Sequence, residues 1–310
     1  MSRIIESLRR QTRWNVARRT SAVRAAAAVG CFALLGTLVI AQDPPDDTRQ
    51  IVAEEFIDAR PAGTAKRPPR RAKAAKPAGK AGVAELGVTI WRLRPAAAGD
   101  DASRLLVQED GESAGWMPER VDAGQKLALG DRVRLSFETP RTGYLYVLDR
   151  EEYADGTYSD TYLIFPTRRP IGSNNAVKAG RLIEIPSRDD RPHYFTVRQS
   201  RPDQVAEVLS AIVSEKPLPD LPLATGPTKL PSDLLTRWDA EWGSSVEQVV
   251  PAGDEARSWS PAEQQAGAEP TRLLTQDDAP PQTIYRVRTR PGRPVLVHIR
   301  LPYGASSPRP

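Results

Sequence analysis

The sequence is poor in cysteine and histidine, and this scarcity excludes several kinds of chemistry. Its 310 residues include one Cys and two His. One Cys cannot form an internal disulfide framework or a site with several thiolate ligands. Two His cannot supply the histidine cluster of a typical catalytic zinc site. The sequence therefore predicts a protein with no metal and no other cofactor.

Excess positive charge is also lacking outside the N-terminal part of the chain. The formal net charge is +5, but residues 1–42 hold seven Arg against one Glu, and residues 60–80 hold eight Lys or Arg and no acidic residue. Residues 81–310 hold 28 Lys or Arg against 32 Asp or Glu. Because a nucleic-acid-binding domain is usually basic as a whole, this distribution argues against nucleic acid as a partner.

The first 42 residues have the pattern of an export signal. Seven Arg precede an uncharged run from Ala25 to Gln42 that is rich in Ala, Val and Leu. A basic region, an apolar region and a small residue at its end are typical of a secretory signal, here with predicted cleavage after Ala41. The apolar run is also close to the shortest that spans a bilayer, so an uncleaved signal anchor is the alternative. We expect export to the periplasm or cell envelope, with membrane attachment only if this segment is retained.

Residues 43–82 are predicted to form a disordered linker. The part from 60 to 82 combines Pro, Ala, Gly and cations with no large apolar residue. Such a composition cannot bury enough surface to offset the entropy lost on ordering. The simplest function is that of a spacer, and adhesion to anionic envelope polymers is the alternative.

From residue 86 onward the sequence has the pattern of short β-strands. In 132–138, Val133, Leu135 and Phe137 alternate with polar residues, as in a strand with one buried face. Residues 143–148 are apolar on both faces, which is typical of a central strand. Further strands are expected at 86–94, 161–165, 181–185 and 193–198.

The later part of the chain mixes strand and helix signals. Residues 203–213 fit either a helix or a buried strand, and periodicity does not decide between them. Leu234, Leu235, Trp238 and Trp242 share one face of a predicted helix at 232–242, and residues 251–281 have the composition of a loop.

Two last strands at 283–289 and 295–301 flank a Pro-Gly turn and predict a hairpin. Together these elements predict an all-β, Ig-like antiparallel β-sandwich with one or two short helices. We expect the domain to cover 83–302 and to be followed by a disordered tail at 303–310.

Several short motifs resemble those of the bacterial DUF4384 family. They are GDRVRLSF, GYLYVL, LIFP, AGRLIEIP and SEKPL. The resemblance covers about 86–220 and implies an Ig-like sandwich, often exported or fused to peptidase and kinase domains. It also implies a strand at 207–213. It implies no catalytic residues, because the family is one of unknown function.

Motifs of common enzymes are missing. The chain contains no G-x-S-x-G, Walker A, G-x-G-x-x-G or H-E-x-x-H sequence. A Ser/His/Asp triad would have to use His193 or His298. His298 lies on the polar face of an alternating strand and is predicted to be solvated, whereas His193 is predicted to have a structural or surface role.

The candidate binding residues lie in two regions. Tyr153 and Tyr158 are close to a polar loop and are predicted to offer a stacking surface to a glycan or a peptide. Arg286, Arg288 and Arg300 are predicted to form a cationic stripe on the outer face of the last hairpin, although such charges also keep an exposed strand soluble.

We therefore expect a non-enzymatic, exported β-sandwich module that binds a protein partner or an envelope polymer. One alternative is a hydrolase, such as a glycan-processing enzyme, that uses Glu151, Asp155 and Asp160 of the loop at 149–160. The same loop is acidic enough to raise the possibility of Ca²⁺, but it lacks the order of ligands of an EF-hand. Another alternative is a membrane-anchored accessory subunit. The patterns say nothing about the oligomeric state.

Overall fold

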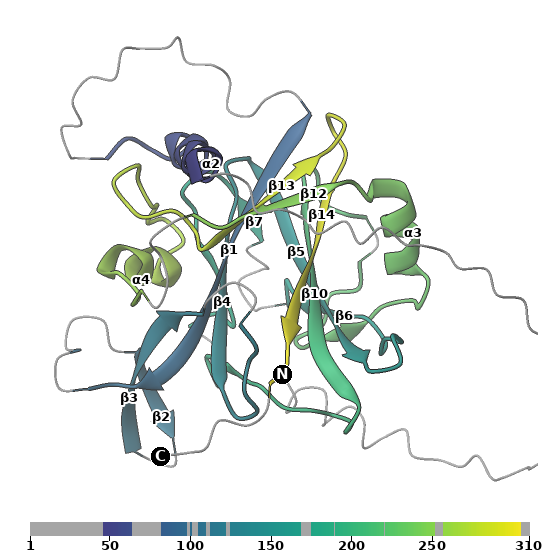
Figure 1. Cartoon of the computed structure of the whole chain (residues 1–310), viewed down its shortest axis with the longest axis horizontal. Helices are drawn as coiled ribbons and strands as arrows, with labels where there is room; N and C mark the ends of the chain where they lie inside the picture. Colours follow the sequence, from purple (N-terminus) through teal and green to yellow (C-terminus); the bar gives the residue numbers. More distant parts are fainter. Residues whose placement is uncertain are drawn as a thin grey trace, which may run out of the picture.

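The computed structural model describes residues 46–63, 82–97, 100, 105–109, 112–121, 125–168, 175–188, 190–219, 221–251 and 257–304. These residues form two antiparallel β-sheets and three short helices (Figure 1). The predicted β-rich class is thereby confirmed, with three helices instead of one or two. The predicted signal segment and its cleavage position at Ala41 lie outside the described residues.

The first sheet has eight strands and is organised around β1. One edge of β1 pairs with β13 and then with β3, while the other edge pairs with β4. The strands of this sheet are β1 (Val83–Pro95), β2 (Leu105–Glu109), β3 (Glu112–Arg120), β4 (Arg132–Glu138), β8 (Ile183–Ile185), β9 (Phe195–Thr196), β12 (Val246–Val249) and β13 (Thr283–Arg288).

The second sheet has six strands, in which β11, β6, β5, β10 and β14 follow one another and β7 also pairs with β5. The register places Leu148 opposite Ser210 and Ser210 opposite His298. The strands of this sheet are β5 (Gly143–Tyr153), β6 (Tyr162–Phe165), β7 (Ala176–Val177), β10 (Gln204–Ser214), β11 (Thr228–Lys229) and β14 (Val295–Pro302). The ambiguous segment 203–213 is thus a strand, and both of its faces are buried.

The main hydrophobic core lies between the inner faces of the two sheets. Val133, Leu135 and Phe137 of β4 enter it from the first sheet, as their alternation predicts. Val295, Val297, Ile299 and Leu301 of β14 enter it from the second sheet. Because both sheets contribute apolar side chains to one cluster, they pack face to face as a sandwich.

The last two strands do not form the predicted hairpin. β13 pairs with β1 and β12 in the first sheet, whereas β14 pairs with β10 in the second. The connection at 289–294 therefore crosses from one sheet to the other, with Gly292 at a φ of 77° in its turn. The prediction was wrong because a Pro-Gly turn between two apolar strands has the same local pattern in both arrangements.

Helix α3 (Leu234–Trp242) covers the outer face of the second sheet. It ends at Trp242 as predicted, and Leu235 is buried against Tyr146, Leu148 and Leu296. Trp238 and Trp242 stack on each other with their ring centroids 4.9 Å apart.

Helix α4 (Pro261–Ala268) lies inside the segment 251–281, which was wrongly predicted to be a loop. Ser260 and Glu263 form a capping box, and Pro261 occupies the first turn. This sequence is a recognisable start of a helix. The helix is short and mostly polar, so it has no hydrophobic periodicity from which it could have been predicted.

Helix α2 (Asp46–Asp58) corrects the predicted linker at 43–82. Val52 and Phe56 are 1% exposed and pack against Val249 and Ile284 of the first sheet. Gly87 of β1 makes this close approach possible, since a Cβ there would lie 2.8 Å from the Phe56 ring. The domain therefore begins before residue 83, and the predicted linker between 64 and 81 lies outside the described residues.

The end of the domain also differs slightly from the prediction. Tyr303 was assigned to a disordered tail, but its backbone N–H donates to the Val205 carbonyl oxygen over 2.9 Å. Its hydroxyl donates to Glu207 Oε1 over 2.9 Å. Tyr303 therefore belongs to the folded domain, and residues 305–310 lie outside the described residues.

Candidate functional site

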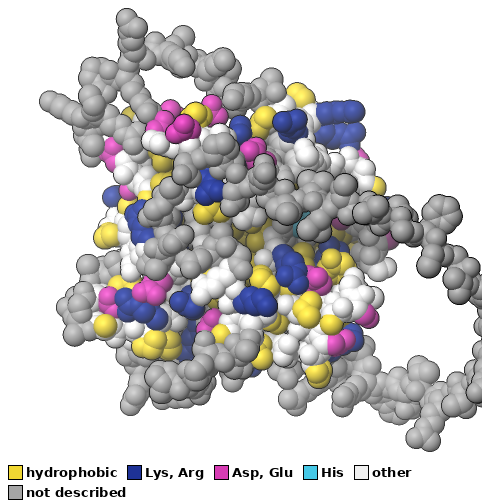
Figure 2. All heavy atoms as spheres, viewed as in Figure 1, with side chains coloured by type: hydrophobic (Ala, Val, Ile, Leu, Met, Phe, Trp, Pro, Cys, Tyr) yellow, Lys and Arg dark blue, Asp and Glu magenta, His cyan; other side chains and the backbone are white. Residues whose placement is uncertain are grey.

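The three predicted cationic binding residues do not form one stripe. Arg286 and Arg288 lie on the first sheet, while Arg300 lies on the second. Figure 2 shows cationic side chains gathered near the turn between β13 and β14, where Arg288 is exposed. Arg300 lies at the opposite end of β14. The prediction of a continuous stripe was wrong because it assumed a hairpin within one sheet.

Arg286 is engaged in contacts within the protein. Its guanidinium lies 3.2 Å from Glu85 of β1, 3.5 Å from Glu247 of β12 and 3.9 Å from Glu55 of α2. Burial raises the pKa of Glu85, and Arg286 opposes this rise. Arg286 therefore joins three elements of the first sheet region and is not a free contact residue.

Tyr153 faces inward instead of offering a stacking surface. It is 5% exposed, and its hydroxyl donates to Glu151 Oε2 over 2.7 Å. The Arg201 guanidinium lies 3.9 Å from the centre of its ring. The prediction failed for Tyr153 because β5 extends to this residue, so the alternation of the strand places the side chain on the inner face.

Tyr158 is exposed, as its predicted role requires. It is 46% exposed, and its backbone forms a bridge with Glu152. The Arg150 guanidinium lies over its ring at 3.8 Å from the centroid, which is cation–π geometry. Tyr158 and Arg150 thus form a stacked pair on the outer face of the second sheet.

Arg300 lies on the same outer face, two strands away from Arg150. Val208 of β10 is the register partner of both arginines. Arg300 Nε donates to Glu152 Oε2 over 2.6 Å, and Glu152 is also bridged to Tyr158. The structure therefore brings Tyr158 and Arg300 together, and we name this surface the Tyr158 strip: Arg150, Glu152, Tyr158, Val208 and Arg300.

Arg150, Glu152 and Val208 of the strip were not predicted from the sequence, and Arg150 is the cation among them. Among the residues that the structure describes, no carboxylate forms an ion pair with Arg150, and its Nε has no hydrogen-bond partner. The predicted strand ended at Leu148, so Arg150 was assigned to a loop. The alternation of 144, 146 and 148 on the outer face, continued by two residues, is the signal that could have found it.

The carboxylates of the hydrolase alternative are not brought together. Glu151 is buried, whereas Asp155 accepts bonds from Thr157 in the exposed turn and Asp160 pairs with Lys229 at 2.6 Å. The bonds from Thr157 lower the pKa of Asp155. These three side chains therefore do not form a pair suited to glycoside hydrolysis.

A different set of carboxylates converges inside the sandwich, and we name it the acidic cluster: Asp149, Glu151 and Glu207. The three are 1%, 4% and 6% exposed. Burial raises the pKa of Asp149 to about 7, with the charge of Glu151 adding to the rise. Burial likewise raises the pKa of Glu207, and so do the charges of Asp149 and Glu151. The cluster is enclosed, so it is a feature of the core and not a binding surface.

The two histidines have different surroundings. His193 is buried, and its Nδ1 lies 3.0 and 2.9 Å from the carbonyl oxygens of Arg188 and Asp190, consistent with the predicted structural role. Burial lowers the pKa of His193. His298 is exposed, as predicted, and it also has two partners: its Nδ1 lies 2.8 Å from Ser210 Oγ and its Nε2 lies 2.7 Å from Asp239 Oδ1.

The Ser210, His298 and Asp239 side chains are the residue types of a nucleophilic triad. Ser210 lies in the middle of β10 and is 0% exposed. A nucleophile must reach the carbonyl carbon of a substrate, which a completely buried hydroxyl cannot do. Asp239 lies on α3, so the three residues connect α3 to two strands of the second sheet.

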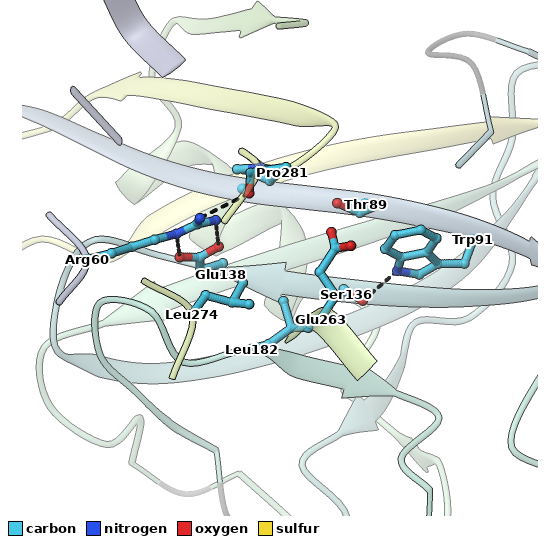
Figure 3. A pocket seen from close by; sticks show the side chains of 11 residues that line it. Arg60, Thr89, Trp91, Ser136, Glu138, Leu182, Glu263, Leu274 and Pro281 are labelled. Carbon is cyan, nitrogen blue, oxygen red and sulfur yellow. Dashed lines mark hydrogen bonds and ion pairs between the residues drawn. The ribbon is translucent and has the colours of Figure 1, made fainter. Parts of the chain in front are cut away.

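A pocket of about 240 Å³, counted with its open mouth, lies on the outer face of the first sheet. Figure 3 shows two carboxylates in its wall: Glu138 lies against Arg60, and Glu263 lies closer to Trp91. Each is bound to an arginine: Arg60 Nε and Nη2 donate to Glu138 over 2.8 and 2.7 Å, and Arg120 Nη2 donates to Glu263 over 2.8 Å. Without the open mouth the cavity measures about 10 Å³, whereas typical ligand pockets measure about 300–1,000 Å³, so this space is far too small for a cofactor.

The wall of this pocket is held by contacts between distant segments. Arg60 Nη1 also donates to the carbonyl oxygens of Asp278 and Ala279, and Trp91 Nε1 donates to Ser136 Oγ over 2.7 Å. The polar groups of the pocket therefore hold the end of α2 and residues 275–281 against the sheet.

The described residues contain neither a metal-binding cluster nor a candidate membrane-spanning helix. No group of three or more His, Cys, Asp or Glu side chains in this part of the chain is arranged to hold a metal ion. None of the described helices combines the length and the apolar character required to cross a membrane.

Comparisons with known proteins return no match among family models, curated proteins or solved structures.

Proposed function

We propose that this protein is a non-enzymatic binding module of the cell envelope and that it contacts its partner through the Tyr158 strip. The observation that carries the proposal is the Arg150–Tyr158 pair. An exposed aromatic ring holds a guanidinium that makes no ion pair with any described carboxylate. Such a cation is free to bind an anionic group of a ligand, while the ring edge remains available for stacking.

The partner that fits this strip best is an anionic envelope polymer, such as an acidic polysaccharide. Arg150 and Arg300 lie on either side of Val208, and Glu152 neutralises only Arg300. Protein interfaces usually centre on an apolar core that is fully buried on binding. The strip has a single exposed aromatic residue and a short apolar stretch, which suits the repeated sugar and carboxylate groups of a polymer better.

Export of the protein, and its place in the periplasm or at the membrane, belong to the same proposal. They rest on the basic and apolar pattern of residues 1–42 and on the predicted cleavage after Ala41. The resemblance to the DUF4384 family stays a prediction. Sequencing the N-terminus of the protein isolated from cells distinguishes a cleaved export signal from a retained anchor.

The binding test uses the full chain and polygalacturonate as the acidic probe, measured by titration calorimetry. Arg150→Ala is expected to weaken binding by about tenfold or more, because a bond to a charged group contributes about 1.5–3 kcal/mol. Raising the salt concentration is expected to weaken wild-type binding as well.

The matched control is Arg288→Ala, which removes an exposed arginine of the first sheet at the other end of the molecule. It retains the basic segment at 60–80 and is expected to bind as the wild type does. Equal affinities of the wild type, Arg150→Ala and Arg288→Ala would contradict the proposal. Neutral dextran is the control probe for binding that does not depend on charge.

A further inference from the structure

The acidic cluster results from the alternation of two neighbouring strands. Leu145 and Val147 of β5 enter the main core, and continuing the same face along the strand brings Asp149 and Glu151 inward. On β10, Leu209 faces the core and Glu207 follows on the same face. The register places Glu151 directly opposite Glu207, so two acidic side chains form a cross-strand pair where like charges are destabilising.

The three carboxylates differ in the donors that reach them. Glu151 Oε2 accepts from the hydroxyls of Tyr153 and Ser200 over 2.7 and 2.5 Å. Glu207 Oε1 accepts from the Tyr303 hydroxyl over 2.9 Å and from Gln204 Nε2 over 3.1 Å.

Asp149 and the second oxygen of Glu207 lack such donors. Three buried oxygens have no hydrogen-bond partner among the described residues: both carboxylate oxygens of Asp149 and Oε2 of Glu207. A buried ionised carboxylate without a donor is strongly disfavoured. Asp149 pairs with Leu209 and Glu151 pairs with Glu207, so Asp149 and Glu207 are diagonal neighbours on one face of the sheet, and their carboxyl groups interact. A hydrogen between them would satisfy one oxygen of each residue.

Among the described residues, the charged and titratable groups around this pair do not neutralise it. Arg201 lies over Tyr153 and is paired with Asp203 at 2.6 Å, and Arg150 lies on the opposite face of β5. Tyr303 and Tyr153 contribute hydroxyl donors. Tyr162 of β6 is the register partner of Asp149. None of the described Lys or Arg side chains forms an ion pair with Asp149 or Glu207.

We propose that Asp149 and Glu207 share a single proton in the folded protein at neutral pH, and that loss of this proton weakens the packing of β5, β10 and Tyr303 at this end of the sandwich. Two buried carboxylates in contact cannot both ionise at low cost, so one keeps its proton. This inference stands independently of the proposed binding function.

The direction of the pH dependence follows from the two states. An unfolded Asp has a pKa of about 3.9. Burial raises the pKa of Asp149 to about 7 in the folded protein. Between these values the folded state holds a proton that the unfolded state has released. Stability from this group is therefore complete below about pH 4 and is lost as the pH rises through about 7.

The test is equilibrium urea unfolding of the full chain at about pH 5 and about pH 8. The wild-type midpoint is expected to fall by roughly 1 M between these values. Asp149→Asn supplies a neutral amide that donates to Glu207, so its midpoint is expected to change much less. Asp155→Asn, an exposed position of the same hairpin, is expected to keep the wild-type fall.

A second variant and a direct measurement keep the test decisive if Asp149→Asn does not fold. Glu207→Gln donates an N–H to Asp149 and is expected to flatten the pH dependence in the same way. Infrared spectroscopy of the wild type at neutral pH is expected to show the carbonyl band of a protonated carboxyl, lost in Glu207→Gln. Absence of that band in the wild type, or parallel pH profiles in the wild type and both variants, would overturn the proposal.

Discussion

The two sheets bury carboxylates in opposite chemical surroundings. On the outer face of the first sheet, Glu138, Glu184 and Glu263 each accept a hydrogen bond from a buried arginine. On the inner face of the second sheet, Glu207 accepts only hydroxyl and amide bonds from the described residues, and Asp149 accepts none. The negative charge of the buried carboxylates is balanced by arginines in the first region and, in our proposal, by a shared proton in the second.

This difference has a structural origin. The carboxylates of the first sheet lie where later segments of the chain cover a polar face. Arg60 follows α2, Arg134 belongs to β4 and Arg120 ends β3, so cations and acids come from different elements. Burial raises the pKa of Glu184 while the charge of Arg134 opposes the rise. The acidic cluster continues an inner face, where the described neighbouring strands supply further acidic residues and neutral hydroxyl and amide donors but no cation paired with Asp149 or Glu207.

The largest expected effect comes from Arg60→Ala, which breaks the arginine-compensated region. The substitution leaves the Glu138 carboxylate buried without its cation and removes the bonds to the carbonyl oxygens of Asp278 and Ala279. Breaking a buried ion pair from one side costs about 3–5 kcal/mol. Urea unfolding at neutral pH measures the loss. Arg288→Ala is the control, and a loss for Arg60→Ala no larger than for that exposed residue would refute the assignment.

The second prediction compares the same chemical change in the two regions at about pH 8. Glu138→Gln is expected to destabilise the protein by about 1–3 kcal/mol, because Arg60 then faces a neutral amide. Asp149→Asn is expected to stabilise it by about 2 kcal/mol, because the amide replaces a buried carboxylate that has lost its proton. Urea unfolding measures both changes in stability. If Glu138→Gln and Asp149→Asn changed the free energy of unfolding in the same direction, the proposed difference between the two regions would be refuted.

A smaller effect is expected from His298→Ala, which leaves both regions intact. The substitution removes the contacts with Ser210 and Asp239 that connect α3 to β10 and β14. Loss of one such connection, with Ser210 left buried, costs about 1–2 kcal/mol. A double-mutant cycle with Asp239→Ala isolates the pair, and we expect a coupling energy of about 0.5–1 kcal/mol. Additive effects of the two substitutions would show that the contact contributes nothing.

Much of the sandwich was predictable because strand alternation is a local property. The inner positions of β4 and of β14 were identified correctly from their period of two. The polar face of β4 was identified as well, but it was expected to be half-exposed. Arg134 and Glu138 on that face are 1% and 2% exposed, since Glu184 of β8 and Trp259 contact Arg134 and Arg60, after α2, binds Glu138.

The candidate site was predicted only in part. Tyr158 and Arg300 are exposed on one face, but Tyr153 is buried and Arg286 is held by three carboxylates. Arg150 was missed because its importance comes from an exposed ring eight residues later and from a strand that extends beyond its apolar part. A short pattern cannot show which charges find partners.

By itself, the sequence determined the β-rich class, the inward faces of the main strands and the helix that ends at Trp242. It did so because periodicity and local propensity act over a few residues. Only the tertiary structure decided that α2 belongs to the domain, that β13 and β14 lie in different sheets, and that Asp149 meets Glu207. These outcomes depend on contacts between residues far apart in the chain, whose selection requires the whole core to form.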